Sequence, residues 1–318
     1  MSLRRPVEPQ GAQEDTLEAL TLRREVPIRV VAADVRVWQR LGDVWTYREL
    51  LLSLVRKELK VKYKNSVLGF LWSMLNPLLT LIVYYFVFQI VLRNGIPMFA
   101  VFLLCGLLIW NFFSAALPGA AQSVVANAGI VKKVAFPREI LALAPVGAAL
   151  FFFSLQALIL LAAVVVFQVH VAWAFVPLLV PALVGLVLFT SALAIFLAAV
   201  NVYLRDTQHL LELVLMAWFW ATPIAYQYEL IAFHLRVRHW PTWLMMLNPV
   251  TPVVVTVQRA IYGSPDPLSH GSRLSLLPMH GPVYYLIPLL AVIVVAAVLY
   301  VAALAVFNRL EGNFAEEL

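Results

Sequence analysis

The chain has 318 residues, of which 63% are hydrophobic and 13% charged, and its mean hydropathy is +0.88. A soluble domain would carry about twice that charged fraction, so composition excludes an ordinary soluble domain and indicates a polytopic membrane protein. The net charge of +6 lies at the ends of apolar segments, which favours a membrane surface over nucleic acid as its partner. The single cysteine, Cys105, excludes an intrachain disulfide.

The N-terminal residues contain no apolar signal-peptide core. Residues 1–29 mix acidic and basic side chains, so we expect a disordered cytoplasmic tail. In residues 30–65, Val31, Val35 and Trp38 begin an apolar series at helical spacing. This pattern predicts an amphipathic helix, either in the cytoplasmic membrane interface or packed on a soluble partner.

Residues 66–310 contain six apolar segments of membrane length, so the expected fold is an all-α integral membrane protein with six transmembrane helices. Residues 311–318 would form a short cytoplasmic tail. The expected spans are 67–92, 99–117, two helices within 139–205 that turn near 168–173, 210–231 with a break at Thr222-Pro223, and 282–307.

The distribution of positive charge predicts the orientation. Of the 23 Lys and Arg residues, only five fall in the expected outer segments, and four of those five lie in one long loop. Long loops translocate largely regardless of charge. We therefore expect both termini to be cytoplasmic.

Two connecting segments stand out. Residues 126–139 form a polar link on the expected cytoplasmic side. On the outer side, residues 232–281 contain an apolar run, Val250–Val257, that is too short to span. That run predicts either short re-entrant helices between the fifth and sixth spans or a helix lying flat on the membrane.

A cluster of cations precedes the first span. The side chains of Lys57, Lys60, Lys62 and Lys64 suit either attraction of a mobile phosphate group or anchoring to lipid head groups. Nearby, Tyr63 and Trp72 fit either a belt of interfacial aromatics or a platform for stacking sugars.

The sequence contains no recognisable catalytic set, metal-binding set or G-x-x-x-x-G-K-[ST] phosphate loop. If the chain transports a substrate, another subunit or an ion gradient must therefore supply the energy. A secondary transporter would normally carry ionisable groups in mid-span and internal repeats, and inspection finds neither.

Several motifs follow one another in a fixed order. They are Lys62-Tyr63-Lys64-Asn65-Ser66 with Leu68-Gly69, Trp72 and Asn76-Pro77; Gly106 to Ser114; Asn127 to Glu139; Arg205-Asp206; Thr222-Pro223 with Tyr226; Leu247-Asn248-Pro249; and Arg259. The series resembles the ABC-2 type permeases that export polysaccharides, over about residues 45–310. Each motif is weak alone, and their order makes the resemblance specific.

The resemblance implies a homodimer paired with two ATP-binding subunits, which bind the ATP and Mg, so the chain itself would need no cofactor and would not be an enzyme. Residues 126–139 match the segment that docks on the ATPase. Residues with an implied coupling role are Asn127, Lys132, Lys133, Phe136 (as apolar anchor), Pro137, Arg138, Glu139, Arg205 and Asp206. For the adjacent Arg205 and Asp206, a solvated pair is the alternative.

The implied substrate is a polyprenyl-diphosphate-linked polysaccharide, exported across the bacterial inner membrane. Its diphosphate would meet Lys57, Lys60, Lys62, Lys64 and Tyr63. Candidate residues lining the glycan path are Trp72, Trp110, Phe112, Phe113, Trp218, Trp220 and Tyr226. The implied outer gate contains Trp240, Trp243, Asn248, Pro249 and Arg259.

Two alternatives remain open. A membrane glycosyltransferase or polymerase would need an acidic residue in the outer loop, where only Glu229 and Asp266 are available. Within the same family, export of a small lipid or drug is the other possibility.

Overall fold

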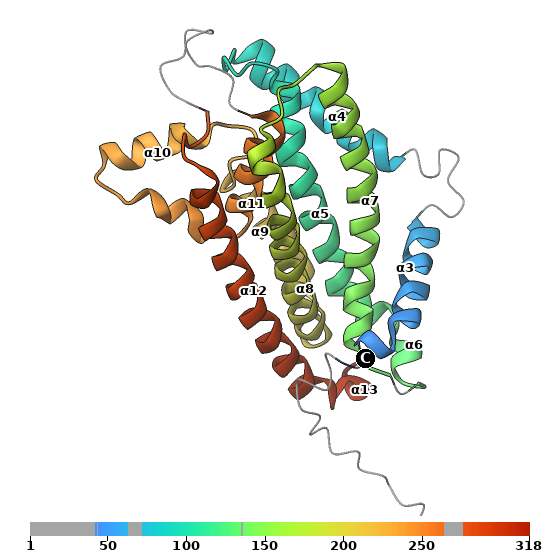
Figure 1. The fold of residues 1–318 in the computed structure, drawn as a ribbon. Coiled ribbons are helices and arrows are strands. Elements are labelled where there is room, and N and C mark those ends of the chain that lie inside the picture. Colours follow the sequence, from blue (N-terminus) through green and yellow to red (C-terminus); the bar gives the residue numbers. More distant parts are fainter. Residues whose placement is uncertain (1–41, 43, 63–71, 135, 264–275) are drawn as a thin grey trace, which may run out of the picture. The chain divides into compact units, whose positions relative to one another are not determined.

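Four long apolar helices form the centre of the structure. They are α5 (Phe99–Ala126), α7 (Glu139–Val166), α8 (Leu179–Tyr203) with its leading 3₁₀ turn Trp173–Leu178, and α12 (Pro282–Glu311) (Figure 1). Each runs for 28 to 31 residues, or at least about 42 Å, which exceeds the roughly 30 Å hydrocarbon core of a bilayer. The computed structural model describes residues 42, 44–62, 72–134, 136–263 and 276–318, and within these ranges it contains helices and loops but no strand.

These four helices confirm the all-helical membrane class and four of the expected spans. The turn expected near 168–173 lies between α7 and α8. All described residues belong to one unit, Val35–Leu318.

Two further apolar helices are shorter than a typical span. The first, α4 (Trp72–Tyr85), continues as a π-helix over Phe86–Val91, and its apolar part covers Leu75–Val91. The second, α9 (Thr207–Trp220), ends just before Thr222-Pro223, where we expected a break because proline cannot donate a helical hydrogen bond. The count of six spans remains a prediction, since residues 67–71 of the first lie outside the described ranges.

Helix α5 is longer than the sequence suggested. We expected it to end near Leu117, before Pro118-Gly119, but it continues through Pro118 to Ala126. A Cβ at Gly119 would lie 3.1 Å from Pro145 Cβ of α7. This close packing of α5 against α7 supports the helix past the proline, as neighbouring helices do for prolines in membrane proteins.

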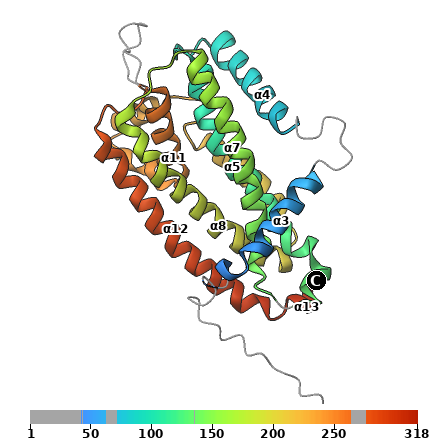
Figure 2. The same cartoon turned by 45° about the vertical axis from the view of Figure 1, so that its right-hand side comes forward.

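Helix α3 (Arg48–Lys62) packs along α7 (Figure 2). Its Leu54 is buried, whereas Arg56, Lys57 and Lys60 are exposed, so the helix is amphipathic as expected. Gly147 allows the approach, because a Cβ there would lie 2.7 Å from Val55 Cγ2. The expected helical residues 30–41 lie outside the described ranges, as does the tail of residues 1–29.

The segment between α9 and α12 is mostly helical. It contains α10 (Tyr228–Val237), a 3₁₀ turn (Thr242–Leu247), α11 (Val250–Val257) and a π-helix (Gln258–Tyr262). All eight residues of α11 are buried, and the helix packs against α5, α8 and α12.

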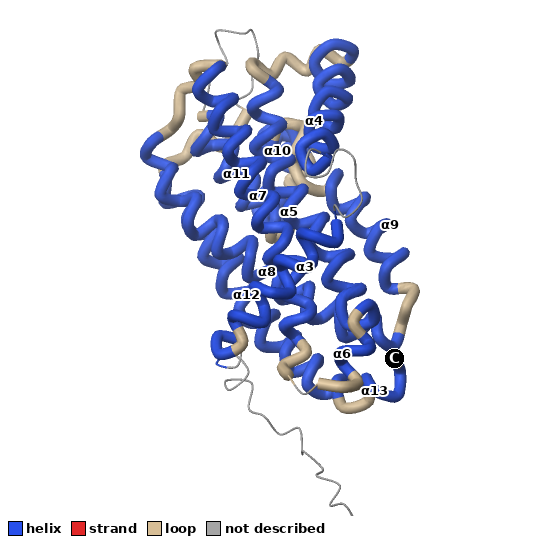
Figure 3. Tube along the Cα trace, turned by 90° about the vertical axis from the view of Figure 1, so that its right-hand side faces the viewer, coloured by secondary structure: helices blue, strands red, loops and turns tan. Residues whose placement is uncertain are grey.

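Several chain segments meet at the end of the bundle that we call the basal end. It contains α6 (Ala128–Val131), the ends of α8 and α12, and the C-terminal α13 (Phe314–Glu317) (Figure 3). A separate buried apolar cluster forms there, which includes Val131, Ile140 and Phe314. The opposite end, with the 168–173 turn and α10, is called the apical end.

Candidate functional site

The link between α5 and α7 is anchored at the basal end by two asparagine hydrogen bonds. Asn127 follows α5 directly, and Lys57 Nζ of α3 donates to its Oδ1 at 2.6 Å. The Asn127 amide in turn donates to the carbonyl oxygen of Ser123 at 2.7 Å. The α3 helix is therefore bonded to the first residue of the polar link, and Lys57 has a protein partner.

The other end of the link is bonded to the last turn of α12. Arg138 Nη1 donates to the carbonyl oxygen of Glu311 at 2.6 Å, and the Tyr203 hydroxyl donates to that of Leu310 at 2.8 Å. Both bonds satisfy carbonyls that a helix end leaves without an intrahelical donor. The link, α8 and α12 are thus joined at one place.

The outward surface of the link carries two cations and two apolar side chains. Lys132 and Lys133 are exposed, and Ile130 and Val134 are 40% and 54% exposed. Phe136, expected as the apolar anchor, is half-buried and packs against the basal cluster. Pro137 is also half-buried, and Glu139 is fully buried at the start of α7, where the helix dipole favours a carboxylate.

Arg205 and Asp206 follow α8 at the basal end. Both side chains are exposed. Their position is compatible with either a contact to another subunit or a solvated pair.

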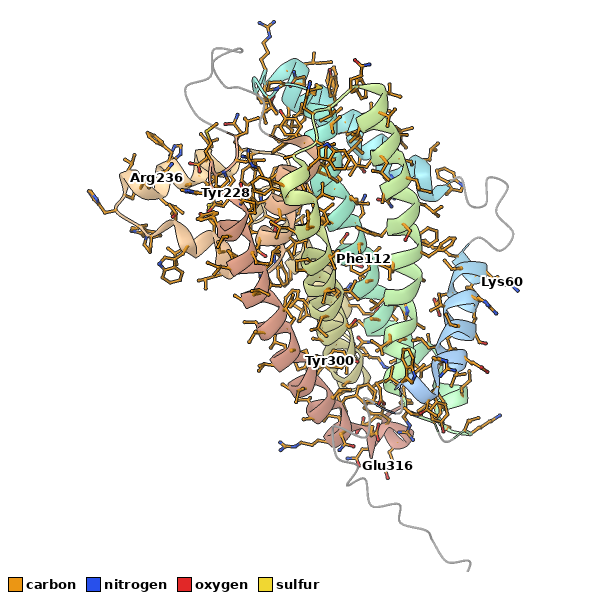
Figure 4. All side chains as sticks on the ribbon, in the orientation of Figure 1. Lys60, Phe112, Tyr228, Arg236, Tyr300 and Glu316 are labelled. Atoms are coloured by element: carbon orange, nitrogen blue, oxygen red, sulfur yellow. The ribbon has the colours of Figure 1, made fainter. Side chains whose placement is uncertain are left out.

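The cations before α4 have different surroundings. Lys60 is exposed on the outward side of α3 (Figure 4). The Lys62 ammonium lies 4.6 Å from the centre of the Phe152 ring of α7, within cation–π distance. Partial burial against the bundle lowers the pKa of Lys62. The neighbouring Tyr63 and Lys64 lie outside the described residues.

A cleft of about 510 Å³ opens between the end of α3 and helices α4, α5 and α7. It brings together Lys62, Trp72 and Phe112, three residues that the sequence analysis placed at the entrance or along the path. The other residues that line it had no predicted site role, although four of them belong to the motifs named above: Asn76, Pro77, Thr80, Asn111, Ser114, Ala115, Ala149, Phe152, Phe153 and Gln156.

The remaining candidate path aromatics do not line this cleft. Trp110 and Phe113 are buried, and Phe113 stacks on Phe189 and meets Trp218 edge to face, with ring centres 5.9 and 5.1 Å apart. Trp220 is 51% exposed, and its carbonyl oxygen accepts a 2.8 Å hydrogen bond from the Tyr226 hydroxyl. Within the described chain these aromatics form contacts around α9.

Asn248, an expected outer-gate residue, forms side-chain hydrogen bonds with α9, the break after α9 and the start of α11. Its Oδ1 accepts hydrogen bonds from Trp218 Nε1 at 2.8 Å and from the backbone N–H of Val250 at 3.1 Å. Its amide donates to Thr222 Oγ1 at 2.9 Å. The residue thereby fixes the start of α11 against the break after α9, and Pro249 directly precedes α11.

Other expected gate residues are spread over the apical end. Trp240 and Trp243 are exposed on either side of Pro241. The Arg259 guanidinium lies 4.9 Å from the Phe175 ring centre. The structure therefore groups Asn248 and Pro249 with Trp218, and holds Arg259 against the α7–α8 connection.

The unpredicted cleft residues had one usable signal in the sequence. Asn111 and Gln156 are amides inside otherwise apolar segments that contain no charged residue in mid-span. Uncharged polar side chains at membrane depth are also costly unless they have partners. That these two residues contact each other could not be predicted, because the sequence does not show how α5 packs against α7.

Membrane-length helices, two of them joined by a polar basal link, define a polytopic membrane protein. The profile of the ABC-2 type transporter family matches residues 49–262, which is more than half of the chain. The chain therefore belongs to the ABC-2 type transporter family.

Curated relatives cover nearly all of the same region. The O-antigen export system permease protein RfbA of Myxococcus xanthus is 33% identical over 276 residues, which cover 87% of this chain and 98% of the relative. Two proteins of that name from Klebsiella pneumoniae are 30% and 31% identical over 273 and 281 residues, which cover 85% of this chain and 95% of each relative.

Proposed function

We propose that this chain is the transmembrane permease subunit of an ATP-driven exporter that moves a polyprenyl-diphosphate-linked polysaccharide from the cytoplasm across the bacterial inner membrane. Family membership and the names of the relatives support export of a glycan. The observation that carries the proposal is the basal surface of Ile130, Lys132, Lys133 and Val134, which we call the coupling surface.

The coupling surface has the composition of a docking site for a protein partner. Exposed apolar side chains flanked by charge provide an apolar contact with a polar rim. The link bearing this surface is bonded to α3 through Lys57 and to α12 through Arg138. A displacement of the coupling surface by a partner would therefore move both helices together.

In the proposed assembly two copies of this chain pair with two ATP-binding subunits, which bind ATP and Mg. The basal end faces the cytoplasm together with both termini, and six helices cross the membrane. ATP binding draws the two coupling surfaces together, and the two bundles then open a path between them. The buried α11 and the preceding α10 act as re-entrant elements of the outer gate.

The chemistry of the outer segment favours this function over a glycosyltransferase or polymerase. Of the two acidic candidates, Glu229 forms an ion pair with Arg236, with Oε2 2.6 Å from Nη2. Asp266 lies outside the described residues. The Glu229 carboxylate is therefore engaged by a guanidinium of the same segment.

The coupling surface is tested by purification of the full chain from its own host. We expect an ATP-binding subunit to copurify with the wild-type chain, and Ile130→Gln with Val134→Gln to lower its yield at least about tenfold. That factor corresponds to about 1.4 kcal/mol of lost apolar contact. Leu52→Gln, at an exposed site on α3, is the matched control and should retain the subunit. Copurification that is unchanged in the double variant, or absent from wild type, would contradict the proposal.

A further inference from the structure

The cleft between α3, α4, α5 and α7 is polar in an otherwise apolar part of the protein. Its lining combines one cation, the amides Asn76, Asn111 and Gln156, and the hydroxyls of Thr80 and Ser114. Its volume of about 510 Å³ lies within the range of about 300–1,000 Å³ found for small-molecule sites.

Asn111 of α5 and Gln156 of α7 form an amide pair that lies far from the ends of both helices. Asn111 Nδ2 donates to Gln156 Oε1 at 3.0 Å. Asn111 is about 18 Å along α5 from Phe99, and Gln156 is about 26 Å along α7 from Glu139, at 1.5 Å per residue. Both residues therefore lie near the middle of membrane-length helices, where exposed polar groups are costly and usually functional.

The amides retain capacity to bind a ligand. Within the described part of the chain, Asn111 Oδ1 and Gln156 Nε2 have no hydrogen-bond partner in addition to the pair itself. The two hydroxyls donate to backbone carbonyls of their own helices, Thr80 to Asn76 at 3.0 Å and Ser114 to Trp110 at 2.8 Å. They remain free to accept, so the cleft offers donors and acceptors together, as a polyhydroxylated ligand requires.

The cation lies beside these groups. Lys62 reaches the cleft from the last turn of α3 and rests on Phe152, about 20 Å along α7 from Glu139. Phe152 contributes a ring face but no anion, so the ammonium keeps its hydrogen-bond donors for an acceptor such as a phosphate oxygen.

Aromatic and apolar surfaces complete the site. Trp72, Phe112 and Phe153 line the cleft, and aromatic faces suit the C–H faces of a sugar ring. On the same helices the exposed side chains of Leu78, Leu79 and Phe151 provide a surface for a hydrocarbon chain.

We propose that this cleft binds the phosphate-linked first sugar of a lipid-anchored saccharide. Lys62 contacts the phosphate, Asn111 and Gln156 bind sugar hydroxyls, and the lipid chain lies along α4 and α7. The inference rests on the proposed function for the nature of the ligand. It assigns head-group recognition to residues inside one protomer, at mid-span.

The test uses the full-length chain in detergent and isothermal titration calorimetry with two probes, farnesyl-diphosphate-N-acetylglucosamine and farnesyl diphosphate. Asn111→Leu and Gln156→Leu should each weaken binding of the sugar probe about tenfold and change binding of farnesyl diphosphate little. Lys62→Met should weaken both probes, and Lys62→Arg should retain both.

The matched control is Gln122→Leu. Gln122 of α5 forms an equivalent amide pair, with its Nε2 2.7 Å from Gln208 Oε1 of α9, outside the cleft. This variant should bind both probes as wild type does. Unchanged melting temperatures exclude misfolding of the variants as the cause of lost binding.

Three results would overturn the inference. They are absence of probe binding to wild type, wild-type affinity for the sugar probe in both amide variants, and equal competition by phosphatidylglycerol, which would identify the cleft as a general phospholipid site. None of these results bears on the export function itself, which is judged by surface glycan and copurification of the ATP-binding subunit.

Discussion

Within the described part of the apical end, the Asn248 side chain joins three chain segments. It joins the end of α9, the Thr222-Pro223 break and the start of α11 through Trp218, Thr222 and Val250. Because a proline interrupts the chain on the α9 side, backbone hydrogen bonds cannot hold these elements together there. The side chain replaces part of that lost connection.

Asn248→Ala should therefore destabilise the protein by about 2–3 kcal/mol, since each net hydrogen bond contributes about 1 kcal/mol. The measurement is the midpoint of thermal unfolding of the full chain in detergent. Asn94→Ala is the control, because Asn94 accepts a single hydrogen bond, from the backbone N–H of Ile96 at 3.1 Å. Equal shifts of the two midpoints would show that Asn248 does not connect the elements.

At this scale the sequence predicted some positions and missed others. Lys62, Trp72 and Phe112 were selected for their residue types and share one cleft, and their roles there stay predictions. The family resemblance implied Phe136 as the apolar anchor; Phe136 is half-buried against the basal cluster, and Ile130 and Val134 are the more exposed apolar residues of the link. Residue type alone does not show which side chains a short connecting segment exposes.

Among the elements, α3 connects the coupling surface to the cleft. It bonds to Asn127 through Lys57 and reaches Phe152 through Lys62. Its contact with α7 depends on the absence of a side chain at Gly147, since a Cβ there would lie 2.7 Å from Val55 Cγ2. Displacement of α3 would disturb both regions.

Gly147→Ala should loosen α3 by about 1.4 kcal/mol, within the usual cost of overpacking. Cleavage of the purified chain by trypsin after Lys57 should then be about tenfold faster, because opening of the helix exposes the site. Gly147→Ala combined with Val55→Ala removes the overlap and should restore slow cleavage. A wild-type cleavage rate in the single variant would show that α3 adapts without moving.

The sequence predicted a helix well where a long run of apolar residues marks it. The long helices α5, α7, α8 and α12 follow from runs of apolar residues, and the end of α9 follows from Pro223. The continuation of α5 through Pro118 does not, because it depends on packing against Pro145 of the next helix. The burial of α11 likewise depends on three helices distant in sequence.

For the whole molecule, family membership and architecture agree on a membrane transport subunit. The ordered motifs were sufficient to predict the family that the profile match shows. Membrane orientation, dimer and partner subunits involve contacts outside a single chain, and these remain proposals. These proposals all depend on one central claim, which is that the chain carries a lipid-linked glycan across the membrane.

The most direct test of that claim is to measure where the glycan is found in cells that lack this chain. Deletion of the gene should abolish the surface polysaccharide while its diphosphate-linked form accumulates inside the inner membrane, and the wild-type chain should restore the surface polymer. Both pools are quantified by extraction of lipid-linked and surface glycan. Surface polysaccharide that persists after deletion would contradict export by this chain, and its loss without internal accumulation would indicate a synthetic enzyme instead.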